Sequence, residues 1–308
     1  MKKVAISVGD LNGIGIQLAL ENHNRIKKMV EPIYCIDEVM LKKASELLDI
    51  DIPTDFQIVD RISKPFEIKA GGISKPSGVY SFASFLKAVE MAKMQDVDAI
   101  MTLPIHKKAW ELAGVKYKGH TDALRDFFFA DAIMMLGVPD MYVALYTEHI
   151  PLGEVASKIE EDSLRRFLVD FYLSAKPTST VAVLGLNPHA GDDGVLGDEE
   201  KIIQKAIDSA TKELNLNRDY PLFTSPLVPD IAFTPNIRKR YQYFIAMYHD
   251  QGLAPLKALY FDEGINVSLN LPIVRTSVDH GTAFDIAYSG VKLNNKSYIN
   301  ALNYLTTT

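Results

Sequence analysis

The sequence predicts an α/β protein with a largely parallel sheet. Short apolar runs alternate along the chain with segments whose apolar residues recur at helical spacing, which is the pattern of strand–helix–strand units. One such run, residues 243–248, is rich in aromatic and branched residues, as expected for a strand buried on both faces. A chain of 308 residues has room for two domains or one large α/β unit.

The amino-terminal half shows this alternation clearly. Three strands are expected, at Lys3–Val8, Glu31–Ile36 and Ala99–Met101. Three helices are expected between and after them, at Val39–Leu48, Ser81–Met94 and from Gly119 to Phe128. Residues 51–76 carry short strand-like pieces with proline and glycine punctuation, which indicates a peripheral excursion.

Two turns in this half admit both a structural and a functional interpretation. Gly9–Gly15 leads the first strand into a helix, and its glycines would let a backbone approach a phosphate, although their spacing does not match the dinucleotide fingerprint. Thr121 or Asp122 is suited to cap the helix that follows Gly119. His120, beside the same helix terminus, is suited equally to the cap region or to contact with an anionic ligand.

The carboxyl-terminal half repeats the pattern. Strands are expected at Met141–Tyr146, Thr180–Leu186 and residues 243–248, and helices at Leu164–Ser174 and Glu199–Leu214. Gly252 and Pro255 are expected to break the chain after the last of these strands. A proline-rich connection spans Pro221–Pro235, and residues 277–283 introduce the last helices.

Composition indicates a soluble, reduced, cytoplasmic protein. The charged residues make up 23% of the chain and are interspersed, with a net charge of −6, so neither a nucleic-acid surface nor a basic membrane patch is indicated. The single cysteine, Cys35, cannot form an internal disulfide. The apolar run Val4–Val8 is too short for a signal peptide, and no apolar stretch approaches the ~20 residues of a membrane span.

Three of the expected strands are followed by a histidine, namely His149, His189 and His249. The carboxyl ends of strands in open α/β sheets are where ligands gather. Three imidazoles delivered to one edge would suit a divalent transition metal such as zinc and would leave a coordination position open for catalysis. The alternative for His249 is a strand cap in which it bonds only to Asp250.

Lys257, Asn266 and Arg275 form a basic–amide–basic set around a turn at Gly264. Two cations and an amide donor are what a phosphate monoester needs, whereas the alternative is ordinary solvated charge. Asp230, in the proline-rich connection, is suited to be a general base, a metal-shell partner or a loop cap.

Four long motifs together resemble the 4-hydroxythreonine-4-phosphate dehydrogenase family of vitamin B6 (pyridoxal phosphate) biosynthesis. They occupy residues 119–122, 186–191, 248–252 and 271–283, in the family's order, and the likeness begins at Ser7-Val8-Gly9-Asp10. The chain departs from the family pattern at Leu11-Asn12, where Pro-Ala is usual, at Leu103 and at Asp122. None of these departures touches a metal or phosphate candidate.

The resemblance implies a fold like that of isocitrate and isopropylmalate dehydrogenases, in two α/β/α domains with mostly parallel sheets and the active site in the interdomain cleft. The first domain would comprise residues 1–135 and 265–308, and the second, with dimer contacts, residues 136–264. The resemblance also implies a homodimer with active sites shared between subunits, in which the third metal ligand, His249, comes from the other subunit.

Residue roles follow from the same resemblance. His149, His189 and His249 would hold one divalent metal (zinc, magnesium or cobalt), and His120, Thr121, Lys257, Asn266 and Arg275 would contact substrate. His280, Gly281 and Thr282 look like the loop that binds NAD or NADP in the β-decarboxylating dehydrogenases. Asp230 is the candidate proton acceptor.

The implied reaction is metal-dependent, NAD(P)-linked oxidation and decarboxylation of 4-phosphooxy-L-threonine to 3-amino-2-oxopropyl phosphate. A sister dehydrogenase for another phosphorylated hydroxy acid, a threonate or erythronate phosphate, would use the same residues. A metal-dependent phosphatase or a phosphosugar-binding protein is the alternative from another class. A phosphatase would normally need carboxylates that bridge two metals.

Overall fold

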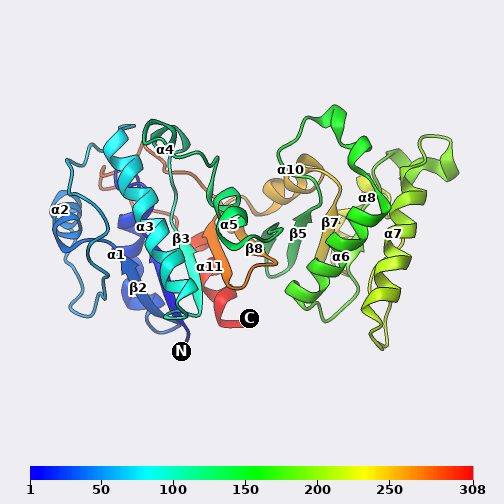
Figure 1. Cartoon of the computed structure of the whole chain (residues 1–308), viewed down its shortest axis with the longest axis horizontal. Helices are drawn as coiled ribbons and strands as arrows, with labels where there is room; N and C mark the ends of the chain where they lie inside the picture. The colour runs from blue at the N-terminus through cyan, green and yellow to red at the C-terminus, as the bar shows by residue number, and fades with distance from the viewer. Residues whose placement is uncertain (308) are drawn as a thin grey trace. The chain divides into compact units, whose positions relative to one another are not determined.

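The computed structural model describes residues 1–307, which fall into two compact units (Figure 1). Unit 1 contains Met1–Ala130, Ile265–Val267 and the residues from Leu271 onward, and unit 2 contains Asp131–Gly264 and Ser268–Asn270. The domains expected at 1–135 with 265–308 and at 136–264 stay a prediction, because a domain is defined by independent folding.

Unit 1 is built on strands in the order β2-β1-β3-β9-β8, of which the pairs β2–β1, β1–β3 and β3–β9 are parallel. Their bounds are β1 Lys3–Ser7, β2 Glu31–Cys35, β3 Ala99–Thr102, β8 Ile265–Leu269, which passes from unit 1 into unit 2, and β9 Val274–Val278. The helices of the unit are α1 Gly15–Ile26, α2 Glu38–Leu48, α3 Lys75–Lys93, α4 Lys107–Leu112, α5 His120–Phe128 and α11 Lys296–Thr307. Each strand predicted in the amino-terminal half is present within about one residue of its expected bounds.

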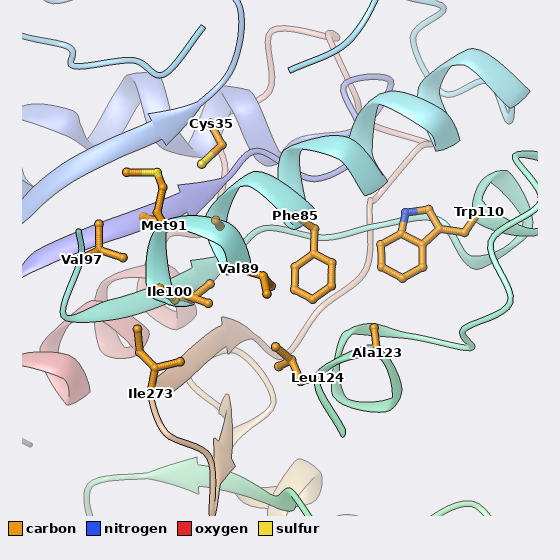
Figure 2. Packing of buried hydrophobic residues seen from close by; sticks show 13 residues of the cluster. Cys35, Phe85, Val89, Met91, Val97, Ile100, Trp110, Ala123, Leu124 and Ile273 are labelled. Carbon is orange, nitrogen blue, oxygen red and sulfur yellow. The ribbon is translucent and has the colours of Figure 1, made fainter. Parts of the chain in front are cut away.

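Helix α3 packs its buried face on the sheet and carries the core of unit 1 (Figure 2). Phe85, Ala88, Val89 and Ala92 recur at intervals of three or four residues, so they share one face of the helix. Trp110 is fully buried beside Phe85, and its indole Nε1 donates to Ser81 Oγ at 2.9 Å. Ala123 and Leu124 of α5 belong to the same cluster, which fixes the start of α5 against the sheet (Figure 2).

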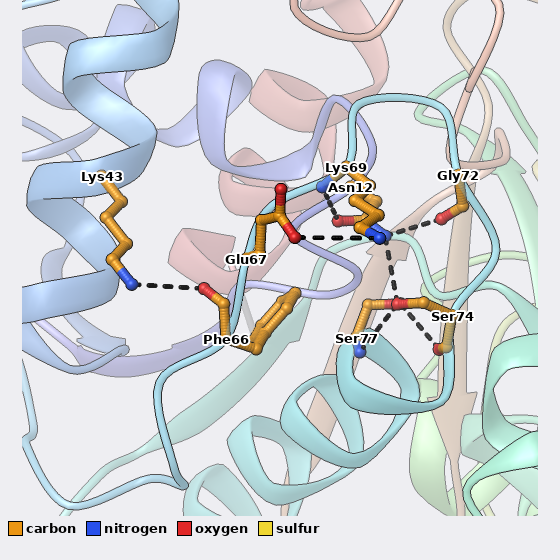
Figure 3. A network of polar contacts seen from close by, with 8 residues as sticks. All are labelled: Asn12, Lys43, Phe66, Glu67, Lys69, Gly72, Ser74 and Ser77. Atoms are coloured by element: carbon orange, nitrogen blue, oxygen red, sulfur yellow. Dashed lines mark hydrogen bonds and ion pairs between the residues drawn. The ribbon is translucent and has the colours of Figure 1, made fainter.

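The glycine turn between β1 and α1 is stiffened by Asn12 (Figure 3). The Asn12 side chain donates to Gly72 O at 2.6 Å and accepts from Lys69 N at 2.9 Å. Ser74, which caps α3 by accepting from Ser77 N at 3.2 Å, lies 3.4 Å from Asn12 Nδ2. The excursion of residues 51–76 is therefore tied to the turn through the residue at which this chain departs from the Pro-Ala pattern.

Unit 2 has strands in the order β4-β5-β7-β6, of which β4 and β5 are antiparallel and the other pairs parallel. The strand bounds are β4 Ile133–Val138, β5 Met141–Leu145, β6 Ala182–Val183 and β7 Tyr243–Ala246. The helices are α6 Glu161–Ala175, α7 Glu199–Leu214, α8 Pro229–Ala232, α9 Pro235–Arg238 and α10 His249–Tyr260. Three short 3-10 segments accompany them, η1 Leu152–Glu154, η2 Ala156–Lys158 and η3 Pro188–Gly194.

Three expectations for the secondary structure were wrong. Strand β6 has two residues, with isolated bridges from Val181 and Leu184 to the chain near Phe223 and Leu227, where seven residues were expected. Strand β4 was not foreseen at all. After Ala283, the described chain forms α11 from Lys296 as its one further helix, where several were expected.

Gly252 and Pro255, which were expected to end β7, lie inside α10, which begins at His249 soon after β7 ends at Ala246. Gly252 is needed there for close packing. A side-chain carbon at this position would lie 2.4 Å from Val143 Cγ1 and 3.0 Å from Ala246 Cβ, so glycine lets α10 lie directly on β5 and β7. No described helix combines the length and apolarity needed to cross a membrane.

Candidate active site

His149 and His249 lie together at the carboxyl ends of β5 and β7, with ring centroids 5.6 Å apart. Each has a carboxylate near Nδ1. His249 Nδ1 is 2.6 Å from Asp250 Oδ1, and His149 Nδ1 is 4.0 Å from Glu148 Oε2. The hydrogen bond to Asp250 favours the His249 tautomer with the proton on Nδ1, which leaves its Nε2 lone pair to bind a metal. The His249–Asp250 bond expected of a plain strand cap is thus also the bond that a metal ligand requires.

His189 lies on η3. In the described part of the chain, no three His, Cys, Asp or Glu side chains are close enough to hold a metal ion. One chain thus brings two of the three predicted ligands together. Its own His189 does not complete the set.

The segment that carries His189 is left-handed. Five successive residues, His189–Asp193, have φ between 46° and 80°. For residues other than glycine this conformation costs about 1–2 kcal/mol each. Such strain persists where the surroundings hold it, and it is typical of functional sites.

Gln251 and Thr147 tie the three histidine-bearing strand ends together. Gln251 accepts from Met247 N at 2.7 Å and donates to Gly185 O at 2.7 Å, which joins the end of β7 to the chain after β6. Thr147 Oγ1 donates to Met247 O at 2.6 Å, which joins the end of β5 to that of β7. These bonds fix the spacing of the backbone from which His149, His189 and His249 project.

Arg275 is the central cation of unit 1 and is 2% exposed. It lies on β9 opposite Ile100 of β3, and its Nε and Nη2 donate to Thr102 Oγ1 at 3.1 and 2.6 Å. Burial lowers the pKa of Arg275 to about 9, so the guanidinium remains charged at neutral pH. A desolvated guanidinium of this kind suits bidentate recognition of an anion.

His120 lies at the first residue of α5, with its ring 4.8 Å from that of Phe85 and 5.3 Å from that of Trp110. Burial, with a smaller contribution from the charge of Arg275, holds the pKa of His120 well below its ordinary value, so the ring is neutral at pH 7. The buried atoms without a hydrogen-bond partner among the described residues include His120 Nε2 and Asn266 Oδ1. Each buried polar atom of this kind needs a specific explanation, and a role in ligand contact or catalysis is one of them.

The helix cap expected at Thr121 or Asp122 is not formed by either residue. The N-cap residue is Gly119, which has no side chain to cap the helix. Asp122 lies inside the helix, and its Oδ2 accepts from Lys118 N at 3.1 Å. Thr121 is buried on α5.

Lys257 and Asp230 lie on helices of unit 2. Lys257 is on α10, two turns after His249, with Nζ 5.9 Å from the ring centroid of Phe261. Asp230 is exposed on α8, which contacts η3. Its role as proton acceptor stays a prediction.

The loop His280–Thr282 packs on the glycine turn of unit 1. Ile14 N donates to Thr282 O at 3.1 Å, and a side-chain carbon on Gly13 would lie 2.7 Å from the same oxygen. The Nδ1 atom of His280 contacts Gly281 O at 3.0 Å, and its Nε2 is buried without a hydrogen-bond partner among the described residues. Two segments singled out from the sequence for phosphate or cofactor contact are therefore neighbours.

Sequence reasoning missed the residues that support the predicted ones. Thr102, Gln251 and Glu200 hold Arg275, the strand ends and the His189 segment respectively. In the sequence, Glu200 is recognisable only as an acidic residue in the first turn of a predicted helix. The helix dipole normally explains an acidic residue at that position.

Comparison with known proteins places these residues in context. A family model described as pyridoxal phosphate biosynthetic protein PdxA matches residues 28–305. A 4-hydroxythreonine-4-phosphate dehydrogenase of Sulfurimonas denitrificans is 59% identical over 97% of this chain and 95% of its own. The crystal structure of 4-hydroxythreonine-4-phosphate dehydrogenase from Klebsiella pneumoniae matches with a TM-score of 0.82 at 28% identity, over 100% of this chain and 98% of that one.

A more distant likeness concerns the fold alone. The β-decarboxylating dehydrogenase of Thermococcus kodakarensis matches over 98% of this chain and 82% of its own, with a TM-score of 0.54 at 13% identity. The predicted fold class, an α/β fold like that of isocitrate and isopropylmalate dehydrogenases with a mixed, mostly parallel sheet, is confirmed.

Proposed function

The chain belongs to the family of the pyridoxal phosphate biosynthetic protein PdxA, and from this membership we propose how its residues carry out the reaction. Its activity is that of a 4-hydroxythreonine-4-phosphate dehydrogenase, an oxidoreductase of pyridoxal phosphate biosynthesis. The observation that carries this conclusion is the 59% identity across 97% of the chain.

The proposed substrate is 4-phosphooxy-L-threonine, and the proposed oxidant is NAD+ or NADP+. Hydride leaves C3 for the nicotinamide while the C3 hydroxyl loses its proton, which gives a β-keto acid. The bond between C2 and the carboxylate then breaks, its electrons pass to the ketone, and carbon dioxide leaves. Protonation at C2 yields 3-amino-2-oxopropyl phosphate.

His149, His189 and His249 are the proposed ligands of one divalent metal, which is zinc, magnesium or cobalt. The fit is supported by the two imidazoles 5.6 Å apart, each with a carboxylate near Nδ1. The ligand expected from the other subunit was His249. Because one chain brings His149 and His249 together, we propose instead that His189 comes from a second copy in a homodimer. When bound, the metal would supply Lewis-acid stabilisation of negative charge on the substrate oxygen.

Lys257, Asn266 and Arg275 are proposed to hold the phosphate, with His120 and Thr121 as further substrate contacts. Binding energy at the phosphate is remote from the reacting carbon and is used to fix its position. The buried charge of Arg275 and the unpartnered Nε2 of the neutral His120 support these roles.

The loop His280–Thr282 is proposed to contact NAD(P), and exposed Asp230 to accept the hydroxyl proton. The buried, reduced state of Cys35 is consistent with a cytoplasmic protein.

A turnover assay on a panel of phosphorylated hydroxy acids tests the proposal, with formation of reduced cofactor followed by absorbance. We expect 4-phosphooxy-L-threonine to be oxidised fastest, and a chelator to abolish turnover until divalent metal is restored. Faster oxidation of a threonate or erythronate phosphate would assign the chain to a sister activity. Phosphate release without cofactor reduction would indicate a phosphatase.

A further inference from the structure

The left-handed segment that carries His189 cannot be explained by its own sequence. Of its five residues with positive φ, only Gly191 adopts that conformation readily. Asp192 and Asp193 are exposed, so burial of their side chains does not hold the segment in place. The conformation must therefore be imposed from outside the segment.

Glu200 is the residue that contacts the chain where the segment begins. Its Oε1 accepts from two successive backbone amides, Leu186 N at 2.8 Å and Asn187 N at 2.7 Å. Its Oε2 accepts from Asn187 Nδ2 at 2.9 Å. One carboxylate thus receives three donors from the two residues just before Pro188.

The same carboxylate also shapes the middle of the segment. A side-chain carbon on Gly191 would lie 2.6 Å from Glu200 Oε2, so the chain passes closely over the carboxylate and needs glycine there. Leu196 N donates to Gly191 O at 3.0 Å, which closes the loop behind it. Glu200 therefore contacts the segment at its entry and at its centre.

The position of Glu200 is fixed by the packing of helix α7. It lies in the first turn of α7, whose residues Ile203, Ala206, Ile207 and Ala210 are buried and which packs on α6. The neighbouring Glu199 accepts from Asn187 Nδ2 at 2.7 Å, and among the described residues no backbone amide of the loop donates to it. A general preference for acids in the first turn of a helix would apply to both residues, but these contacts apply to Glu200 alone.

We propose that Glu200 is a positioning residue, whose carboxylate imposes the left-handed conformation and so presents the imidazole of His189 in one orientation. The expected effect on metal binding rests on the proposed function, in which His189 is a ligand. The expected effect on the conformation of residues 186–197 does not depend on that function.

The test uses the full-length protein after metal removal, with Zn²⁺ affinity measured by competition against a chelating dye. Loss of a residue that orients a metal ligand typically weakens binding about 10- to 100-fold, and we expect this for Glu200→Ala. Glu199→Ala removes the same charge from the same turn and should stay within about threefold of the native protein. Glu200→Gln keeps an oxygen for both backbone amides and should recover most of the affinity.

Amide hydrogen exchange provides a readout without metal. In Glu200→Ala we expect faster exchange in residues 186–197 and unchanged exchange in α6. Native-like Zn²⁺ affinity and native-like exchange in Glu200→Ala would overturn the proposal, as would a Glu200→Gln protein as weak as Glu200→Ala. If Glu200→Ala fails to fold, Glu200→Asp, whose carboxylate is withdrawn by one methylene, is compared with Glu199→Asp. We expect weaker Zn²⁺ binding in Glu200→Asp alone, and equal affinity in the two variants would overturn the proposal.

A separate variant keeps the two proposals distinguishable. If His189→Ala binds Zn²⁺ as tightly as the native protein, the metal assignment fails. The exchange result for Glu200→Ala then still decides whether this residue holds the segment.

Discussion

Replacement of Arg275 by methionine separates recognition of the phosphate from general charge. Arg275 is 2% exposed on β9, and its guanidinium is held by Thr102 Oγ1. Methionine fills a similar volume without charge or hydrogen-bond donors. An exposed arginine contributes little to binding by comparison, so Arg61→Met on the exposed excursion is a matched control.

The magnitude follows from the burial of the cation. Loss of a charge-assisted contact from a desolvated guanidinium to a phosphate ester should cost about 2–4 kcal/mol of transition-state stabilisation, or roughly 30- to 1000-fold in kcat/KM. The loss in the free energy of unfolding should be far smaller. Thr102 forfeits a hydrogen bond worth about 0.5–1.5 kcal/mol, whereas removal of a buried charge is often neutral or stabilising.

The assay compares kcat/KM for 4-phosphooxy-L-threonine with that for 4-hydroxythreonine, which lacks the phosphate. Arg275→Met should reduce the first steeply and the second only slightly, while Arg61→Met should change neither. Urea unfolding should show a free energy of unfolding within about 2 kcal/mol of the native value. Equal losses on both substrates would mean that Arg275 supports the fold and does not bind the phosphate.

Two further predictions concern subunit sharing and pH. A mixture of inactive His189→Ala and His249→Ala dimers should regain activity after subunit exchange. A mixture of His149→Ala and His249→Ala dimers should not, because these two residues lie together in one chain. Recovery of activity in the second mixture, with exchange confirmed by mass spectrometry, would contradict this arrangement. His23 is 1% exposed, and burial lowers its pKa below the ordinary value, so the unfolded chain takes up a proton near pH 6.5 that the folded chain does not. The free energy of unfolding should therefore fall as pH decreases below about 6.5, by at most about 1.4 kcal/mol per pH unit for this group. In urea unfolding between pH 7.5 and 5.5, His23→Gln should reduce the dependence of the free energy of unfolding on pH. An unchanged dependence on pH would refute the assignment to His23.

Elements whose pattern is local could be predicted from the sequence. Helix α7 occupies the predicted residues, Glu199–Leu214, because its apolar spacing and its acidic first turn agree. Helix α10 could not be predicted, because Gly252 normally marks a break, and its packing on Val143 is visible only in the fold. The residues that flank β6, Val181 and Leu184, form isolated bridges with Phe223 and Leu227, and these pairings are long-range and carry no local signal.

The candidate site divides in the same way. Strand ends predicted the places of His149, His189 and His249, since open sheets present such residues at one edge. The proximity of His149 to His249 depends on Thr147, Gln251 and the start of α10, which no local pattern encodes. The left-handed conformation at His189 depends on the carboxylate of Glu200, eleven residues away.

The central claim is that the three histidines hold one catalytic metal, and metal content measured by elemental analysis tests it most directly. The native protein should bind about one divalent ion per active site. His149→Ala, His189→Ala and His249→Ala should each lose the metal and turnover together, with circular dichroism unchanged. Full metal occupancy in a folded His189→Ala protein would contradict the claim.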